Sequence, residues 1–284
     1  MEKIDRLGWA EGFSFTSFGA KIGVRATQPG FVESLARLLP PGWRASNKSR
    51  VERLYSFVVG GPDPRRNIRR LNLVYRDADR LARDREIEPI LHAFDADVRL
   101  NVGILARRRV FVHAGVVGWK GRAIVIPGRT MTGKTSLVAA LLRLGAEYYS
   151  DEYAVLDLKG RVHPFAKPLS IRHAGEPIAT RVPAQAFGAR TGTRALPIAV
   201  IVDTHFREGS RWRPKMVSRS VGMLSLLGNT ITARLRPARN MPVLRDAVRS
   251  ATILKGVRGD AESTARDVLA LLDAGTNVGL RSRQ

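Results

Sequence analysis

The segment from Gly128 to Thr135 constrains this chain most, because it follows the phosphate-loop (Walker A) pattern G-x-x-x-x-G-K-[ST]. An apolar run at residues 123–126 precedes it, and a helical pattern opens at Lys134. In a strand–loop–helix arrangement, glycines let backbone N–H groups turn inward around phosphate oxygens, and the helix N-terminus adds partial positive charge. The alternative is a glycine-containing turn that only caps a helix. The strand and helix on either side favour the phosphate site.

Each position of this loop has an expected partner in a nucleotide. Lys134 supplies a full charge to the β- and γ-phosphates, and the Thr135 hydroxyl ligates Mg²⁺. The cofactors predicted are therefore ATP and Mg²⁺. The complete predicted nucleotide site consists of Gly128, Arg129, Thr130, Met131, Thr132, Gly133, Lys134, Thr135 and Ser136.

A pair of acidic residues, Asp151 and Glu152, follows the loop by about one helix length. A short apolar run precedes the pair, so it is expected at the end of a strand beside the loop. One carboxylate can hold Mg²⁺ while the other accepts a proton from an attacking hydroxyl. The alternative is a solvent-facing acidic turn, but adjacent acids at this distance from the loop favour a functional pair.

With these pieces placed, residues 112–157 resemble the C-terminal catalytic domain of the HPr kinase/phosphorylase family. That family has a histidine-bearing strand, a hairpin, a P-loop, a helix ending near glycine and an acidic pair. The corresponding residues here are His113, the loop, Gly145, and Asp151 with Glu152. The resemblance implies a fold similar to phosphoenolpyruvate carboxykinase and phosphorylation of a serine on a protein. It makes Asp151 the base for the substrate hydroxyl and assigns Thr135 and Glu152 to the metal.

The chain departs from the family pattern at several positions. Met131 stands where the family has a glycine, Thr135 replaces its usual serine, and Glu152 replaces its second aspartate. The glutamate-arginine-glycine signature that follows the acidic pair in the family is missing, and residues 163–172 stand in its place.

Three further residues are candidates for the same site. His113 would lie beside the acidic pair, where it could polarise Asp151 or touch phosphate; the alternative is a satisfied core histidine. Lys167 and Arg172 could meet the γ-phosphate or the transition-state charge, and surface charge is the alternative. The predicted catalytic residues are Asp151, His113 and Arg172. A basic segment at residues 207–215 carries Trp212 and could hold adenine or a partner protein, although an ordinary exposed loop is the simpler interpretation.

The amino-acid composition limits the chemistry, the partners and the cellular location that we expect of this protein. The 284 residues include no cysteine, which excludes disulfides, thiolate zinc sites and cysteine nucleophiles. Lys and Arg number 48 against 25 Asp and Glu, for a formal net charge of +23. The basic residues are scattered and no nucleic-acid-binding motif accompanies them, so nucleic acid is not the expected partner; either a solvated arginine-rich surface or an anion-attracting one would explain them. No apolar stretch is long enough for a membrane span or secretory leader. We expect a cytoplasmic protein, and homo-oligomer formation stays open.

The pattern along the chain predicts an α/β protein of two domains. Residues 1–108 read as a small α/β domain, with strands at 21–26, 54–59 and 71–75 and helices at 31–39 and 88–105. Residues 109–275 read as a carboxykinase-like P-loop kinase domain with a mixed sheet. It has a hairpin at 110–126, a helix at 136–144, short strands in 148–156, a strand at 196–203 and helices at 221–227, 243–250 and 261–272. Residues 276–284 are expected to form a flexible tail.

Three functions fit these features. The leading hypothesis is an ATP-dependent kinase that transfers the γ-phosphate to a serine-type hydroxyl of a protein or peptide. A small-molecule kinase with the same site is the second. A nucleotide-binding regulatory module without significant catalysis is the third.

Overall fold

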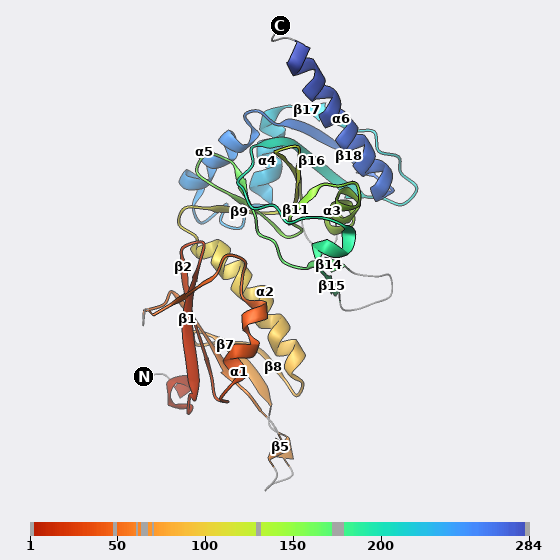
Figure 1. The fold of residues 1–284 in the computed structure, drawn as a ribbon. Coiled ribbons are helices and arrows are strands. Elements are labelled where there is room, and N and C mark those ends of the chain that lie inside the picture. Colours follow the sequence, from red (N-terminus) through yellow and green to blue (C-terminus); the bar gives the residue numbers. More distant parts are fainter. Residues whose placement is uncertain are drawn as a thin grey trace. The chain divides into compact units, whose positions relative to one another are not determined.

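The computed structural model describes residues 3–47, 50–60, 62–63, 68–69, 71–128, 132–171 and 179–281. Six α-helices and several sheets in this part of the chain make a mixed α/β architecture, as the sequence predicts. The chain divides into two compact units, Met1–Arg108 and Arg109–Gln284 (Figure 1). None of the helices in the described residues combines the length and apolar character needed to cross a membrane.

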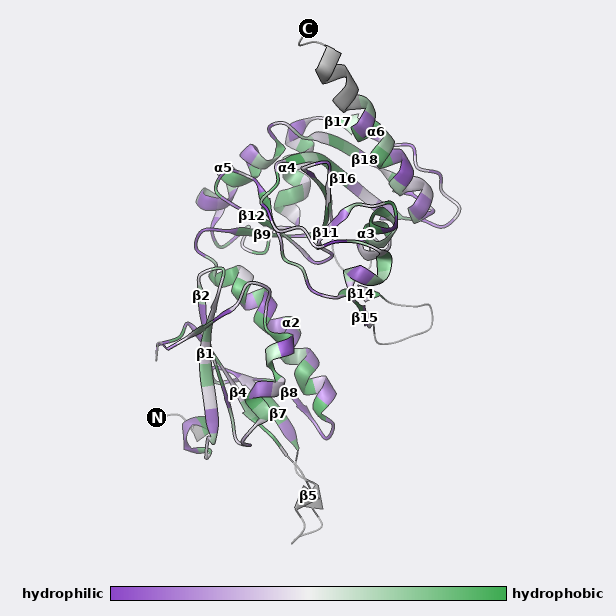
Figure 2. Ribbon diagram, viewed as in Figure 1, coloured by the Kyte–Doolittle hydropathy of each residue, from purple (hydrophilic) through white to green (hydrophobic). Residues whose placement is uncertain are grey.

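The first unit is a six-stranded sheet with strand order β3-β1-β2-β4-β7-β8 and a long helix, α2, that packs on it. Phe94 of α2 sits against the rings of Tyr55 and Phe57 on β4, with centroids 5.1 Å away in both pairs. Figure 2 shows hydrophobic and hydrophilic residues interspersed along α2, as expected of a helix with one buried face. The elements of this unit are η1 (Lys3–Arg6), β1 (Glu11–Ser17), β2 (Ala20–Ala26), α1 (Phe31–Ser34), η2 (Ala36–Leu38), β3 (Arg44–Ser46), β4 (Arg53–Val58), β5 (Pro62–Asp63), β6 (Ile68–Arg69), β7 (Asn72–Arg76), β8 (Asp79–Asp84) and α2 (Ile87–Leu105).

One helix of this unit differs from the expectation. The sequence predicts a continuous helix at 31–39, but α1 ends at Ser34 and a 3₁₀ turn, η2, follows. Pro40 explains why the helical stretch goes no further than Leu38, since a residue before proline is forced out of the helical region; Leu39 has ψ 144.

The second unit is built on a mixed sheet with order β13-β12-β9-β10-β16-β18-β17, and β11 also pairs with β9. Strands β10, β16 and β18 are parallel, while β9 is antiparallel to β10. Its elements are β9 (Val110–Trp119), β10 (Arg122–Pro127), α3 (Lys134–Arg143), β11 (Glu147–Ser150), β12 (Tyr153–Leu156), β13 (Val162–His163), β14 (Leu169–Ile171), β15 (Thr180–Val182), η3 (Ala184–Phe187), β16 (Ile198–Phe206), β17 (Lys215–Val217), α4 (Arg219–Gly228), α5 (Pro237–Val248), β18 (Thr252–Arg258) and α6 (Ala261–Arg281).

Helices cover both faces of this sheet, and alternation along β10 shows how. Ile124 and Ile126 belong to an apolar cluster with α3 and α6, whereas Ala123 and Val125 belong to a second cluster with α4 and α5. In Figure 1, α3 lies beside α6 and α4 beside α5, in agreement with their packing. A strand buried on both faces explains why the residues before the loop are apolar without interruption.

The last helix overlaps the segment expected to form a tail. Helix α6 continues to Arg281, past residue 276 where the sequence predicts a flexible segment. Its earlier turns are anchored by the buried side chains of Ala265, Val268 and Leu269, and adding residues to an existing helix gains one hydrogen bond each. Residues 282–284 lie outside the described part.

Candidate functional site

The loop between β10 and α3 is held to strand β9. The Gly128 N–H donates to the carbonyl oxygen of His113 (3.1 Å), so the loop leaves the sheet level with this histidine. Gly133 is the N-cap of α3 and has φ 81, a conformation that favours glycine. Helix α3 begins at Lys134, as the sequence predicts. Arg129, Thr130 and Met131 lie outside the described residues.

Lys134 is the most unusual group of this loop because its ammonium is buried. Its pKa is lowered, mainly because burial penalises the charged form, and the carboxylates of Asp151 and Glu152 act in the opposite direction. The lysine therefore lies within electrostatic reach of both acids. Thr135 is half-buried and Ser136 is exposed in the first turn of α3. A desolvated cation at a helix N-terminus is suited to receive phosphate oxygens.

The acidic pair lies in the turn between β11 and β12, across β9 from the loop. β11 pairs with the second half of β9 and β12 with its first half, so the pair falls at the middle of β9. The Ala114 N–H donates to the carbonyl of Glu152 (3.1 Å) and fixes the turn to that strand. Ser150 Oγ accepts from the N–H groups of Glu152 (3.0 Å) and Tyr153 (2.9 Å), which shapes the turn.

Asp151 is buried and receives three donors. The Tyr148 hydroxyl donates to Oδ1 (3.0 Å), the Ser170 N–H donates to Oδ2 (3.0 Å), and Lys167 Nζ lies 3.1 Å from Oδ1. The pKa of Tyr148 is strongly raised, chiefly by burial and then by Asp151. A carboxylate offers about four acceptor positions, so these three donors leave about one of them unused.

Lys167 also approaches the second acid, with Nζ 3.6 Å from Glu152 Oε2. Its contacts with Pro168 O (3.4 Å) and Ser170 Oγ (3.2 Å) hold the ammonium in place. The sequence offered Lys167 as a partner of phosphate; in the structure its contacts are to both acids. Arg172, the other cation suggested for that role, lies outside the described residues.

His113 completes the group. Its ring lies 4.8 Å from that of Tyr153, and burial lowers its pKa, with Glu152 raising it and Lys134 lowering it further. The structure thus brings together His113, Lys134, Asp151 and Glu152, which are separated in the sequence.

Arg258, the last residue of β18, also contacts the phosphate loop, although the sequence patterns do not place it there. It is 2% exposed, and its guanidinium donates to the carbonyl oxygens of Gly133 (2.6 Å) and Gly259 (2.9 Å). Burial lowers its pKa, although Asp260 acts in the opposite direction. No carboxylate among the described residues forms an ion pair with it. The sequence indicates a turn after a strand here, but no local signal shows that the arginine folds back onto the phosphate loop.

The donor set suits Mg²⁺. The Thr135 hydroxyl and the Glu152 carboxylate are hard oxygen ligands, and Mg²⁺ in nucleotide sites takes only one or two carboxylates besides phosphates. Across the residues that the structure describes, no three His, Asp or Glu side chains gather into a separate metal site.

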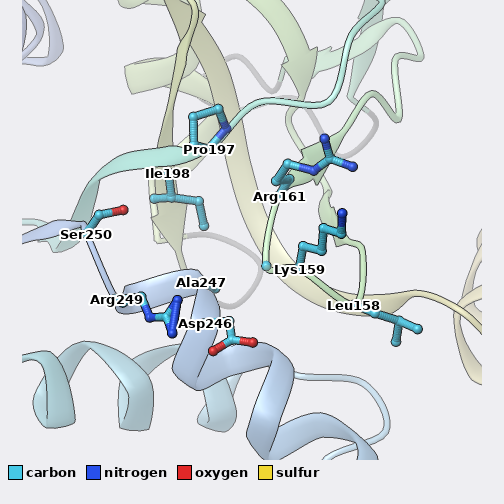
Figure 3. Close-up of a pocket in the computed structure, with 10 residues that line it drawn as sticks. Leu158, Lys159, Arg161, Pro197, Ile198, Asp246, Ala247, Arg249 and Ser250 are labelled. Atoms are coloured by element: carbon cyan, nitrogen blue, oxygen red, sulfur yellow. The ribbon is translucent and has the colours of Figure 1, made fainter.

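A cavity of about 370 Å³ lies elsewhere in this unit (Figure 3). Ile198, in its lining, pairs with Ala123 at the start of β10, whereas the phosphate loop leaves the end of that strand. The cavity is therefore at the opposite edge of the sheet. Its lining consists of Leu158, Lys159, Gly160, Arg161, Pro197, Ile198, Asp246, Ala247, Arg249 and Ser250, none of which belongs to the predicted site.

Comparisons with known proteins give little more. No protein-family model matches the chain, and no curated protein matches it. Among solved structures, the Hpr(Ser) kinase/phosphatase from Coxiella burnetii is similar, at 13% sequence identity and a TM-score of 0.30, over 61% of this chain and 98% of that one. A similarity at this TM-score is weak and assigns no activity to this chain.

Proposed function

We propose that this protein is an ATP-dependent kinase, related to the HPr serine kinases, that transfers the γ-phosphate to a serine-type hydroxyl of a protein or peptide. The observation that carries the proposal is that adjacent residues of β9 hold the phosphate loop and the acidic turn, because Gly128 N–H donates to His113 O (3.1 Å) and Ala114 N–H donates to Glu152 O (3.1 Å). Phosphoryl transfer needs a cation on the transferred phosphate and a carboxylate beside the acceptor, and Lys134 and Asp151 would supply both. The hairpin before the loop fits a carboxykinase-like arrangement.

In the proposed reaction, Asp151 accepts the proton of the substrate hydroxyl. The hydroxyl oxygen forms a bond to the γ-phosphorus as the bond to the β–γ bridging oxygen breaks, and ADP leaves. Lys134 holds the phosphates, and Thr135 and Glu152 would hold Mg²⁺. When bound, Mg²⁺ neutralises charge on the β- and γ-phosphate oxygens. Neutral His113 is a neighbour of Glu152 that can donate or accept a hydrogen bond.

The test is phosphate transfer from ATP labelled on its γ-phosphate. A panel of serine-containing peptides, free serine and simple sugars serves as acceptors. We expect phosphoserine on peptides, with Asp151→Asn lowering the rate by about 10²- to 10⁴-fold while ATP still binds. Asp246→Asn is the matched control, because Asp246 forms an ion pair with the neighbouring Arg245 (3.2 Å) on α5 and lines the cavity at the opposite edge of the sheet. An Asp151→Asn variant as fast as wild type would rule out the proposed base.

Labelling of free serine or a sugar instead of peptides would replace this proposal with the small-molecule kinase. One observation favours a nucleotide-binding module without turnover. Asp151, the proposed base, already forms an ion pair with Lys167. ATP binding with no transfer to any acceptor and no hydrolysis would support that module and contradict the kinase.

A further inference from the structure

An exposed aromatic ring stands at the phosphate loop. Phe206 ends β16, the parallel neighbour of β10, so both strands finish at the same edge of the sheet. A Cβ atom built on Gly133 would lie 3.3 Å from Phe206 Cβ, which places the two residues in direct contact. Phe206 is 54% exposed. The residue is therefore both at the proposed phosphate site and open to solvent.

The exposure of Phe206 contrasts with the first five residues of its strand, which are buried. The aliphatic residues of β16 are buried, namely Ile198, Val200, Ile201 and Val202. Side chains alternate along a strand, so Phe206 points to the same face as Val202, which packs in the cluster with α3 and α6. At that position more than half of the Phe206 surface is exposed, so the ring contributes little to the apolar core of the unit.

Arg258 supports this ring. Its guanidinium carbon lies 5.6 Å from the centroid of Phe206, over the ring, and its N–H groups are fixed on the carbonyls of Gly133 and Gly259. Because Arg258 is buried and its position is set by two hydrogen bonds, it braces the ring on one side. A braced aromatic ring loses little conformational entropy when a second flat group stacks on it.

The other aromatic residue near this edge is not available in the same way. Trp212 is half-buried and packs against the apolar cluster of the α3 face. The Arg207 N–H donates to Arg258 O (2.8 Å), which joins the start of the Trp212 loop to the end of β18. Of these two residues, Phe206 is the one whose ring is exposed to solvent beside Gly133.

We propose that Phe206 is the stacking platform for the base of the nucleotide whose phosphates the loop holds. Base–aromatic stacking contributes about 1–3 kcal/mol per base and requires only a flat exposed ring. The inference rests on the proposed function, because it needs a nucleotide in the phosphate loop. It adds the element that distinguishes a nucleoside triphosphate from a bare polyphosphate.

The experiment compares two ligands that share their phosphates. Dissociation constants for ATP and for inorganic tripolyphosphate, both with Mg²⁺, are measured by calorimetry on full-length wild type, Phe206→Ala and Phe206→Trp. Phe206→Ala should weaken ATP by about tenfold, which corresponds to about 1.4 kcal/mol, and leave tripolyphosphate unchanged. Phe206→Trp should retain ATP affinity. Leu224→Ala is the control, since Leu224 is exposed on α4, on the other face of the sheet, and should alter neither ligand.

The outcomes separate the two claims. If wild type binds both ligands but Phe206→Ala binds ATP as tightly as wild type, the platform is wrong and the phosphate site stands. If Phe206→Ala weakens both ligands equally, the ring acts on the loop and not on the base, which also overturns the inference. If wild type binds neither ligand, the proposed function fails and the inference fails with it.

Discussion

The ammonium nitrogen of Lys167 lies 3.1 Å from Oδ1 of Asp151, the carboxylate proposed as the base. Both side chains are largely out of solvent, with 13% and 3% of their surfaces exposed. Tyr148 and Ser170 hold the same carboxylate from other directions. Lys167 therefore keeps a buried negative charge compensated beside the phosphate loop.

Removing one partner of this ion pair should show how much the pair contributes to the free energy of unfolding. We expect Lys167→Met to lower the free energy of unfolding by about 3 kcal/mol, because Asp151 would keep a buried charge without its cation. Urea unfolding of Lys167→Met, Asp151→Asn and the double variant measures this. The double variant should lose less than the sum of the single losses, by at least about 1 kcal/mol. Strict additivity would show that the two residues do not interact.

Arg258 should couple fold stability to phosphate binding. Arg258→Met removes the donor to the Gly133 carbonyl (2.6 Å), and we expect a loss of about 2–3 kcal/mol in unfolding free energy, typical of a hydrogen bond to a charged group. Arg258→Lys keeps the charge but not the planar fork that reaches two carbonyls, so it should fall between Met and wild type. Tripolyphosphate affinity should follow the same order. Wild-type affinity in a folded Arg258→Met variant would contradict this.

The lowered pKa of His113 predicts a pH dependence of stability. At pH values just below 6.5, the ordinary imidazole pKa, His113 is protonated in the unfolded chain but not yet in the folded protein, because folding lowers its pKa. Stability should therefore fall as pH falls from 6.5 and level off once the folded pKa is passed. Urea unfolding at about pH 7.5 and about pH 5.5 should show a smaller difference in His113→Gln than in wild type. His205→Gln, exposed near the end of β16, is the matched control and should keep the wild-type difference.

Gly115 on β9 is expected to be intolerant of a side chain. A Cβ atom there would lie 2.6 Å from Val138 Cγ2 on α3, so Gly115→Ala should cost about 1–3 kcal/mol by overpacking. Val138→Ala in the same chain makes room, and the double variant should recover part of the loss relative to the sum. Gly228→Ala, with nothing within 4 Å of its added Cβ, serves as control. Equal losses with and without Val138 would mean that the clash is not the cause.

The sequence predicts best those parts of this protein whose signals are local. The β9–β10 hairpin, the start of α3 and the strands around Asp151 all follow from apolar runs, glycines and a helix pattern. The sequence indicates β18 only as a strand before the turn at residues 258–260 and gives it no bounds, because the apolar residues of TILKGVR do not alternate. The sequence does not predict β8, because its residues, DRLARD, are mostly polar, as is common for an edge strand.

Long-range contacts within the site could not be anticipated in the same way. Lys167 and Ser170, which contact Asp151, belong to a later segment of the chain. Arg258 contacts Gly133 although most of the second unit's sequence lies between them. These contacts depend on how strands are ordered in the sheet, which no short pattern encodes. The packing of Trp212 against the cluster on the α3 face likewise differs from the ordinary exposed loop that the sequence indicates.

Strand β9 carries both halves of the proposed chemistry. Its residue His113 accepts from Gly128, the next residue, Ala114, donates to Glu152, and the two bonds are adjacent on one extended backbone. In the proposed reaction, the distance between the phosphate loop and the acidic turn is therefore set by the one strand to which both are hydrogen-bonded. Descendants of such a protein could exchange the loops that recognise an acceptor, and so acquire new substrates, without having to retune the distance over which the phosphate moves.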